Sequence, residues 1–117
     1  TKNIKKVEEI IPVQGENRKP FEVFLEVNHC LSQGNYAKAY ELLENYHPNY
    51  AEKFYKEYFY ALICKESGKL DDAIKHFVLA ETINPSFWPA HFNHGMLVKE
   101  RGKEEFAKRI EFIKATL

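Results

Sequence analysis

The sequence predicts an all-α fold of three successive helix–turn–helix repeats, and two recurring residue types support this prediction. Glycine recurs at a spacing of 34 residues, at Gly34, Gly68 and Gly102. An alanine follows each of these glycines at the same distance. Between them, apolar residues return every three or four positions, as they do along one face of a helix. A repeat of this length, with one helix on either side of a tight turn, buries its apolar faces by stacking on its neighbours.

Composition indicates one globular domain with a modest core. The 117 residues are 44% hydrophobic and 29% charged, which argues against disorder. Seventeen basic residues balance 17 acidic ones, so there is no basic footprint for nucleic acid. No apolar run reaches the roughly 18–20 residues that span a bilayer, and no secretory signal is visible. We expect neither a nucleic-acid nor a membrane partner. The chain begins at Thr1 rather than at a methionine, as a piece of a longer protein would.

The two cysteines, Cys30 and Cys64, also stand 34 residues apart and so occupy the same place in successive repeats. Packed helices lie ~8–10 Å apart, whereas a disulfide needs Cα atoms within ~7 Å. We therefore expect two buried, reduced thiols. Reduced thiols are typical of a reducing compartment, which predicts a cytoplasmic protein.

Residues 1–19 precede the first repeat and are predicted to be an N-terminal extension or linker. Ile4, Val7 and Ile10 have the spacing of a short helical stripe, which Pro12 ends. Two interpretations stay open: a partly ordered tail, or a segment whose apolar residues pack onto the repeats and fill their groove.

The first repeat covers about residues 20–53, and Pro20 suits the first turn of its first helix. Gly34 marks the turn, and the run 47–49 ends the second helix. The apolar residues of the two helices are Val23, Val27, Cys30, Leu31, Ala39, Leu42, Leu43 and Tyr46.

The second repeat covers about residues 54–87. Its first helix begins before Phe54, near Tyr50 or Ala51, and its many aromatic residues predict that it is covered on more than one side. Gly68 can take the positive φ that ends a helix, and Pro85 ends the second helix. The stripe of the second helix is Ala73, Phe77, Ala80 and Ile83.

The third repeat covers about residues 88–117, with Ser86 as the expected N-cap and Pro89 in the first turn. Gly102 is the expected turn. The second helix then carries a stripe of Phe106, Ile110, Ile113 and Leu117. Phe112 lies off this stripe and is expected to be exposed, because no capping helix follows. Either the chain continues in a longer protein, or this end meets a partner or a second copy.

The second repeat resembles the tetratricopeptide repeat family, and the resemblance extends over about residues 20–117. The family pattern has small residues at three places, an aromatic residue and a proline, and the matching residues are Ala61, Ala73, Ala80, Phe77 and Pro85. Glu57 replaces the family tryptophan. The third repeat has Glu111 for the aromatic residue and Lys114 for the last small residue, so the flanking repeats are degenerate. The resemblance implies a right-handed α-solenoid that serves protein–protein interaction.

Two narrower resemblances suggest more specific alternatives. The run 84–97 is similar to repeats appended to some bacterial chemotaxis receptor methyltransferases, which would make the chain a regulatory domain of a bacterial signalling enzyme. The three-repeat layout resembles that of type III secretion translocator chaperones.

The tetratricopeptide resemblance implies a concave groove, lined by the first helix of each repeat, that binds a partner peptide or helix. Aromatic residues at such a surface favour an apolar or amphipathic ligand. The alternative interpretation is that several of these rings only fill space between helices. The expected groove residues are Phe21, Phe24, Asn28, Tyr55, Tyr58, Leu62, Lys65, Phe92, Met96 and Lys99.

A second mode of the family, the clamp for a terminal carboxylate, is not expected. Of its five characteristic side chains only Asn28 is present. The other four places hold Phe24, Phe59, Pro89 and Asn93.

We expect no catalytic activity, cofactor or metal from this chain. His91 and His94 have a spacing that can bind metal, but no further ligand joins them at a recognised spacing. Asp71 and Asp72 are explained by the start of a helix, whose dipole carboxylates complement. The prediction is a protein-interaction scaffold. Its alternatives are a regulatory domain of a larger enzyme, a secretion chaperone and a purely structural role.

Overall fold

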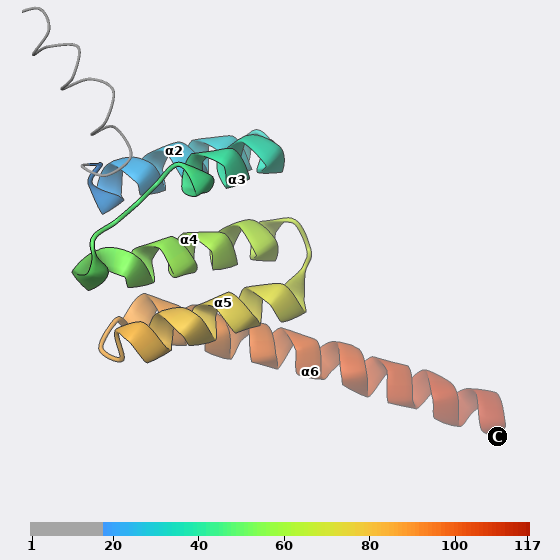
Figure 1. The fold of residues 1–117 in the computed structure, drawn as a ribbon. Coiled ribbons are helices and arrows are strands. Elements are labelled where there is room, and N and C mark those ends of the chain that lie inside the picture. Colours follow the sequence, from blue (N-terminus) through green and yellow to red (C-terminus); the bar gives the residue numbers. More distant parts are fainter. Residues whose placement is uncertain (1–17) are drawn as a thin grey trace, which may run out of the picture.

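The chain folds into two helical hairpins followed by one long helix (Figure 1). The structure, a computed structural model, describes residues 18–117, and over that range it is all-α. The predictions for residues 1–17 lie outside the described residues. The elements are α2 (Pro20–Ser32), α3 (Tyr36–Glu44), the 3₁₀ turn η1 (Tyr50–Glu52), α4 (Lys53–Glu66), α5 (Leu70–Ile83) and α6 (Trp88–Thr116).

Glycine closes both hairpins, as the sequence predicts. Gly34 has a φ of 71° and Gly68 a φ of 84°, a region that side chains with a Cβ rarely adopt. At the first turn, the Asn35 N–H donates to the Cys30 carbonyl at 2.8 Å and the Gly34 N–H donates to the Leu31 carbonyl at 3.0 Å. The same pair of bonds recurs at the second turn. This Schellman arrangement satisfies the last carbonyls of α2 and α4, so each turn is fixed by its own local sequence.

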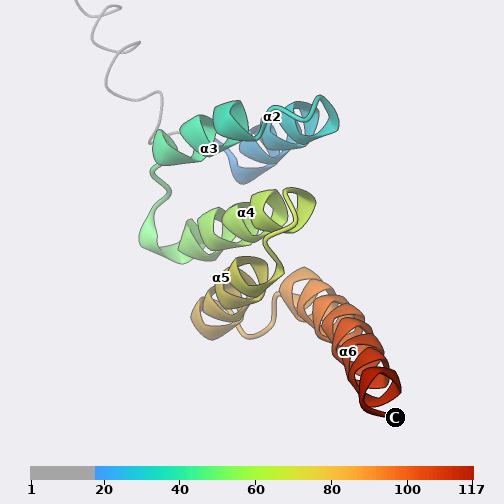
Figure 2. The same cartoon turned by 90° about the vertical axis from the view of Figure 1, so that its right-hand side faces the viewer.

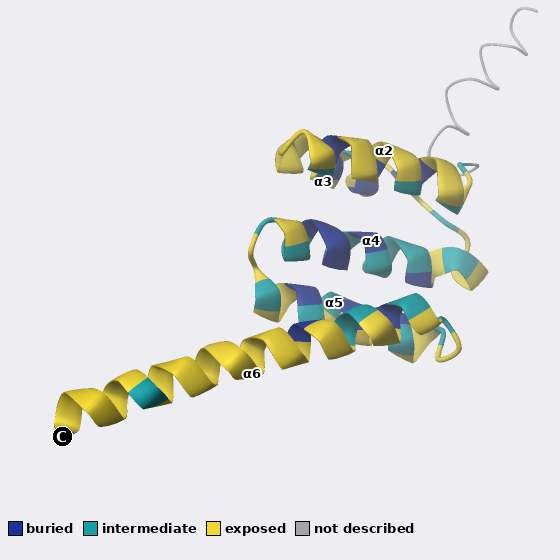
Figure 3. Ribbon diagram, turned by 180° about the vertical axis from the view of Figure 1, so that it is seen from behind, coloured by how far each residue is buried: buried dark blue, intermediate teal, exposed yellow. Residues whose placement is uncertain are grey.

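Helix α4 is the centre of the stack, and it contacts α2, α3 and α5 (Figures 1 and 3). This confirms the expectation that it is covered on more than one side. The alanines at the closest helix contacts, among them Ala39, Ala61 and Ala73, are fully buried. A side chain this small lets the helices approach each other closely. The buried residues of α4 are Phe54, Phe59, Ala61, Leu62 and Ile63.

The two cysteines are free, as expected. Cys30 is buried and Cys64 is half-buried. Burial raises the pKa of the Cys64 thiol, so the reactive thiolate is disfavoured at neutral pH.

The start of α6 differs from the prediction in its cap. Ser86 is not the N-cap, because α6 begins at Trp88 and Phe87 precedes it. The Ser86 N–H and hydroxyl instead donate to the Asn84 side-chain oxygen, at 3.2 and 2.9 Å. Pro89 does lie in the first turn.

The predicted turn at Gly102 is wrong, because α6 runs through it as one helix of 29 residues. A helix folded back here would place Glu111 and Lys114 where the preceding repeat buries Phe77 and Ala80. Burying two charges is costly, whereas a glycine inside a helix costs only about 1 kcal/mol. The straight helix is therefore favoured, and the second helix expected for the third repeat is absent from the described chain.

The second half of α6 extends beyond α5 and away from the stack (Figures 1 and 2). Leu97 is its last buried residue. Phe112 is exposed, as the sequence predicts. Within residues 18–117, no helix, α6 included, combines the length and apolarity that crossing a membrane requires.

Substitutions at Gly68 and Gly102 test whether α6 is continuous. The two glycines occupy the same place in the 34-residue repeat, but only Gly68 has a positive φ. We expect Gly102→Ala to stabilise the fold by about 1 kcal/mol, because alanine favours a helix interior. We expect Gly68→Ala to destabilise it by about 1–2 kcal/mol, because alanine at positive φ is strained. Urea denaturation followed by circular dichroism measures both. Destabilisation by Gly102→Ala would contradict the continuous helix.

The ring of Tyr46 is buried, and within the described chain its hydroxyl has no hydrogen-bond partner. Burial raises its pKa to about 12, and the nearby Glu52 adds to the rise. The folded state therefore keeps this proton up to about pH 12, whereas the unfolded chain loses it near pH 10. The stability that depends on the neutral ring is complete below pH 10 and is lost as the pH rises toward 12.

We expect Tyr46→Phe to be neutral or stabilising by about 1 kcal/mol at pH 7, because it removes an unsatisfied buried hydroxyl. The variant should also lose less stability than the parent between pH 10 and 12. Denaturation curves of the parent and the variant at pH 7, pH 10 and pH 12 measure both effects. A clear loss of stability at pH 7 would show that the hydroxyl has a partner.

Candidate peptide-binding groove

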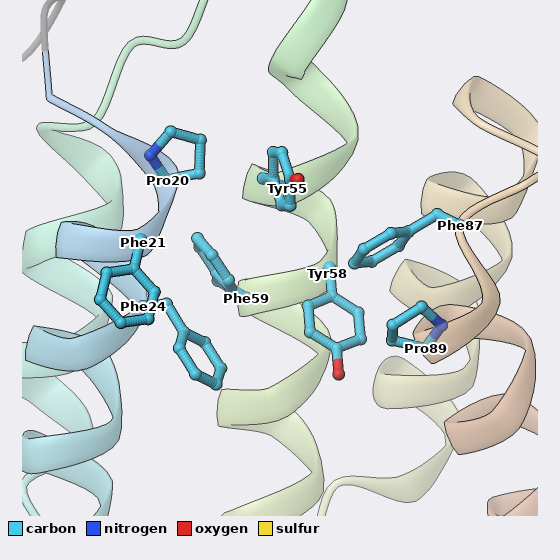
Figure 4. Close-up of a pocket in the computed structure, with 8 residues that line it drawn as sticks. All are labelled: Pro20, Phe21, Phe24, Tyr55, Tyr58, Phe59, Phe87 and Pro89. Atoms are coloured by element: carbon cyan, nitrogen blue, oxygen red, sulfur yellow. The ribbon is translucent and has the colours of Figure 1, made fainter.

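An aromatic hollow of about 270 Å³ lies where the first turns of α2, α4 and α6 come together (Figure 4). The spacing of three or four residues along α2 and α4 turns their rings to the same side. Phe87 and Pro89 close the hollow from the start of α6. We call this the aromatic hollow; its lining residues are Pro20, Phe21, Phe24, Tyr55, Tyr58, Phe59, Phe87 and Pro89.

Most rings of the aromatic hollow are held in place by other rings. The centroids of Phe24 and Phe59 are 5.6 Å apart, and Phe87 meets Tyr58 edge-to-face at 5.0 Å. Such pairs stabilise one another beyond their buried area. Phe21 differs, because 68% of its surface is exposed. The hollow thus combines a fixed aromatic wall with one free ring at its edge.

A polar hollow of about 390 Å³ continues from the aromatic one and shares Phe24 and Tyr58 with it. Asn93 is one of its lining residues. Its amide nitrogen lies 3.1 Å from the Tyr58 hydroxyl and 2.9 Å from the Pro89 carbonyl, and it donates to both. The Lys65 ammonium donates to the Asn93 side-chain oxygen at 3.3 Å. This network links α4 to α6 across the floor. The lining residues are Phe24, Asn28, Leu31, Ser32, Tyr58, Leu62, Lys65, Glu66 and Asn93.

A third hollow, of about 400 Å³, shares Lys65 and Asn93 with the polar one. Its lining is charged, with three lysines and two glutamates beside three apolar side chains. Because neighbouring hollows share residues, the three form one continuous groove along α2, α4 and α6. The lining residues of the third hollow are Lys65, Leu70, Asn93, Met96, Leu97, Lys99, Glu100, Lys103 and Glu104.

The structure brings together nine of the ten predicted groove residues. The exception is Phe92, which lines none of the three hollows and packs against Trp88, with ring centroids 6.3 Å apart. The nine are Phe21, Phe24, Asn28, Tyr55, Tyr58, Leu62, Lys65, Met96 and Lys99.

Several further residues line the groove without having been predicted, and Phe59, Phe87 and Asn93 are the most important of them for the two hollows at its start. Phe59 and Asn93 stood out only as mismatches to a carboxylate clamp. Phe87 lies in the loop before α6, so a pattern of helix positions does not reach it. An aromatic residue next to Trp88 and Pro89 was the available signal.

Burial raises the pKa of Tyr58, and the hydrogen bond from Asn93 offsets part of this rise. The phenol is therefore neutral at pH 7. The aromatic hollow presents neutral rings and a hydroxyl, which suits an apolar ligand group with a polar atom beside it.

Three of the five histidines pair with glutamates at helix contacts rather than in the groove. His76 lies 2.8 Å from Glu57, and His94 and His91 lie 2.9 and 3.4 Å from Glu81. Among residues 18–117, no group of three or more histidine, cysteine, aspartate or glutamate side chains is arranged to hold a metal ion.

Comparison of the chain with protein-family models, with curated proteins and with solved structures finds no match.

The Asn93 network makes a spectroscopic prediction. We expect Asn93→Ala to raise the pKa of Tyr58 further, because the variant removes the donor that stabilises the phenolate. Asn28→Ala is the matched control, since Asn28 lines the same hollow. An NMR titration of the tyrosine ring carbons, with the exposed Tyr50 as reference, measures the pKa. An equal shift in both variants would show that Asn93 has no specific effect on Tyr58.

Proposed function

We propose that residues 20–117 form a right-handed solenoid of the tetratricopeptide type that binds a partner peptide. The α2–α3 and α4–α5 hairpins supply two repeats, and α6 supplies the first helix of a third. The small residues of the pattern, such as Ala61, Ala73 and Ala80, are fully buried at helix contacts. Stacked first helices of this kind form one extended surface, which is the usual binding face of such arrays.

The aromatic hollow is the observation that carries the proposal. Six aromatic side chains and two prolines surround an open space of about 270 Å³, which is large enough for one or two apolar side chains of a ligand. Rings that are already packed lose little freedom when a ligand binds. The ligand is therefore a protein segment with a large apolar anchor.

The polar hollow fits the chain that follows such an anchor. Asn28 and the Lys65–Asn93 pair offer amide and ammonium groups, which hydrogen-bond to main-chain carbonyls. A segment lying along the groove would therefore place its apolar anchor among the rings and its backbone over Asn93. The same chemistry serves a separate interaction protein, a chaperone or a regulatory domain of a larger enzyme.

A selection with displayed random peptides tests this function. Peptides selected on the unmodified chain should be enriched in aromatic or leucine residues. They should bind Phe21→Ala at least about tenfold more weakly, because an aromatic side chain that closes over a bound apolar group is a typical hot spot. Leu25→Ala is the matched control, since Leu25 is an exposed apolar residue of α2 outside the groove. It should change affinity by less than about twofold.

Phe21 is mostly exposed, so its substitution should leave helicity unchanged. Fluorescence anisotropy of a labelled peptide measures binding, and circular dichroism verifies the fold. Equal affinity for Phe21→Ala and the parent would overturn the groove as the binding site. Peptides selected only on a chain without residues 1–17 would show that this segment occupies the groove, as the structural alternative requires.

A further inference from the structure

The outer face of α6 carries an apolar stripe along the whole helix. Its members follow one another every three or four residues, so they share one side of a continuous helix. The opposite side carries Ala90 and Leu97, which are buried in the contact with α5. We call this outer stripe the α6 seam; it consists of Trp88, Phe92, Gly95, Lys99, Gly102, Phe106, Ile110, Ile113 and Leu117.

The α6 seam is open to solvent at both ends of the helix. Trp88 and Phe92 at its start are 69% and 59% exposed, and Phe106 is 67% exposed. At Gly95 and Gly102, no other residue of the described chain comes within 4 Å of the place a Cβ would take. The seam therefore has large apolar groups toward both ends and two gaps between them.

We propose that the α6 seam binds the α6 seam of a second copy, with the two helices antiparallel. In this arrangement the start of one helix lies against the end of the other. Trp88 then meets Leu117 of the second copy, Phe92 meets Ile113, and the gap at Gly95 receives Ile110. Both helices make the same contacts, as a two-fold interface requires.

Lys99 determines the direction of pairing. Parallel helices would place Lys99 against Lys99, a like-charge contact that costs affinity. Antiparallel helices place it against Phe106, where its stem covers the ring and its ammonium group lies over the ring face. In the antiparallel arrangement the two helix dipoles also point in opposite directions, so the positive end of each helix lies beside the negative end of the other.

The straight form of α6 identifies a second copy as the occupant. Residues 103–117 carry the apolar groups that complement residues 88–101, but a straight helix cannot fold one half onto the other. The α6 of another copy carries the same two halves and, in the antiparallel direction, brings each half against the other. The α6 seam lies on the Phe106 side of the helix, whereas Phe112 is on a different side and remains exposed. The proposed contact thus lies on the Phe106 side of α6, whereas the sequence alone suggests possible self-association on the Phe112 side.

The exposed area is sufficient for such a pair. An aromatic side chain buries ~150–250 Å² when it is covered, so three that are about two-thirds exposed, with Ile113 and Leu117, offer roughly 500–600 Å² in each copy. Two copies then bury about 1,000–1,200 Å² together, which reaches the lower limit for a specific interface.

Sedimentation equilibrium of the full chain at about 10–200 μM tests the dimer, with Ile113→Asp and Phe112→Asp as a matched pair. Both residues are exposed on the free half of α6, but only Ile113 belongs to the α6 seam. We expect the parent and Phe112→Asp to dimerise and Ile113→Asp to remain monomeric, with equal helicity in all three. A monomeric parent, or the same behaviour of both variants, would overturn the proposal.

Disulfide trapping tests the direction in a background of Cys30→Ala and Cys64→Ala. Gly102→Cys lies close to the two-fold axis of the antiparallel pair, so it should cross-link two copies. Leu117→Cys should not, because the two chain ends lie at opposite ends of the pair. Cross-linking of Leu117→Cys as readily as Gly102→Cys would indicate parallel helices and overturn the proposed pairing.

Discussion

The burial of α4 on several sides is the constraint on which the rest of the structure depends. Its alanine, Ala61, lets the neighbouring helix approach closely, and Phe59 and Ile63 fill the space on either side. A helix this well covered cannot shift without losing contacts to three others. The rings of Tyr55 and Tyr58 are therefore held from behind, and their outer faces form a wall that a ligand does not have to order.

The hairpins were predictable because their signals are local. A helix that ends in glycine at positive φ satisfies its own last carbonyls, so Gly34 and Gly68 mark their turns whatever packs around them. The apolar residues that follow, such as Ala73, Phe77 and Ala80, have helical spacing and are buried. From α2 to α5, the 34-residue period, the glycine turns and the buried apolar residues all predict the same helices. A fold can be predicted from one sequence when such local and long-range signals are consistent.

Gly102 shows where the same reasoning fails. A glycine permits a turn but does not require one, because it is also tolerated inside a helix at modest cost. Whether a turn forms depends on whether the segment after the glycine buries apolar side chains when it folds back on the preceding helix. With Glu111 and Lys114 at the places of Phe77 and Ala80, that burial is missing. The deciding residues lie a full helix away from the glycine, so a local turn signal could not reveal the outcome.

The groove was predictable to the extent that it follows from helix positions. Phe21, Tyr58 and Met96 line it because the first helices stack side by side. Phe92 shares the register but not the surface, since the start of α6 turns its ring toward Trp88. Phe87 lines the aromatic hollow instead. It belongs to the loop between α5 and α6, and the course of this loop depends on how the two helices pack. Loop geometry of this kind is set by tertiary packing and not by periodicity.

In the proposed assembly, helix α6 contributes to two surfaces that lie on largely different sides of the helix. One side supplies Asn93 and Met96 to the groove, and the α6 seam lies on another. A helix that packed against a partner and bound a ligand with the same residues could do only one at a time. In the proposed dimer the α6 seam and the groove share only Lys99, which lines the third hollow, so the aromatic and polar hollows stay open in both copies. Two linked grooves bind a partner with two matching segments far more tightly than one, because the second contact forms at a high effective concentration. Because α6 continues through Gly102 instead of turning, the chain has a long helix in place of a third hairpin, and in the proposed dimer this helix joins the two binding surfaces.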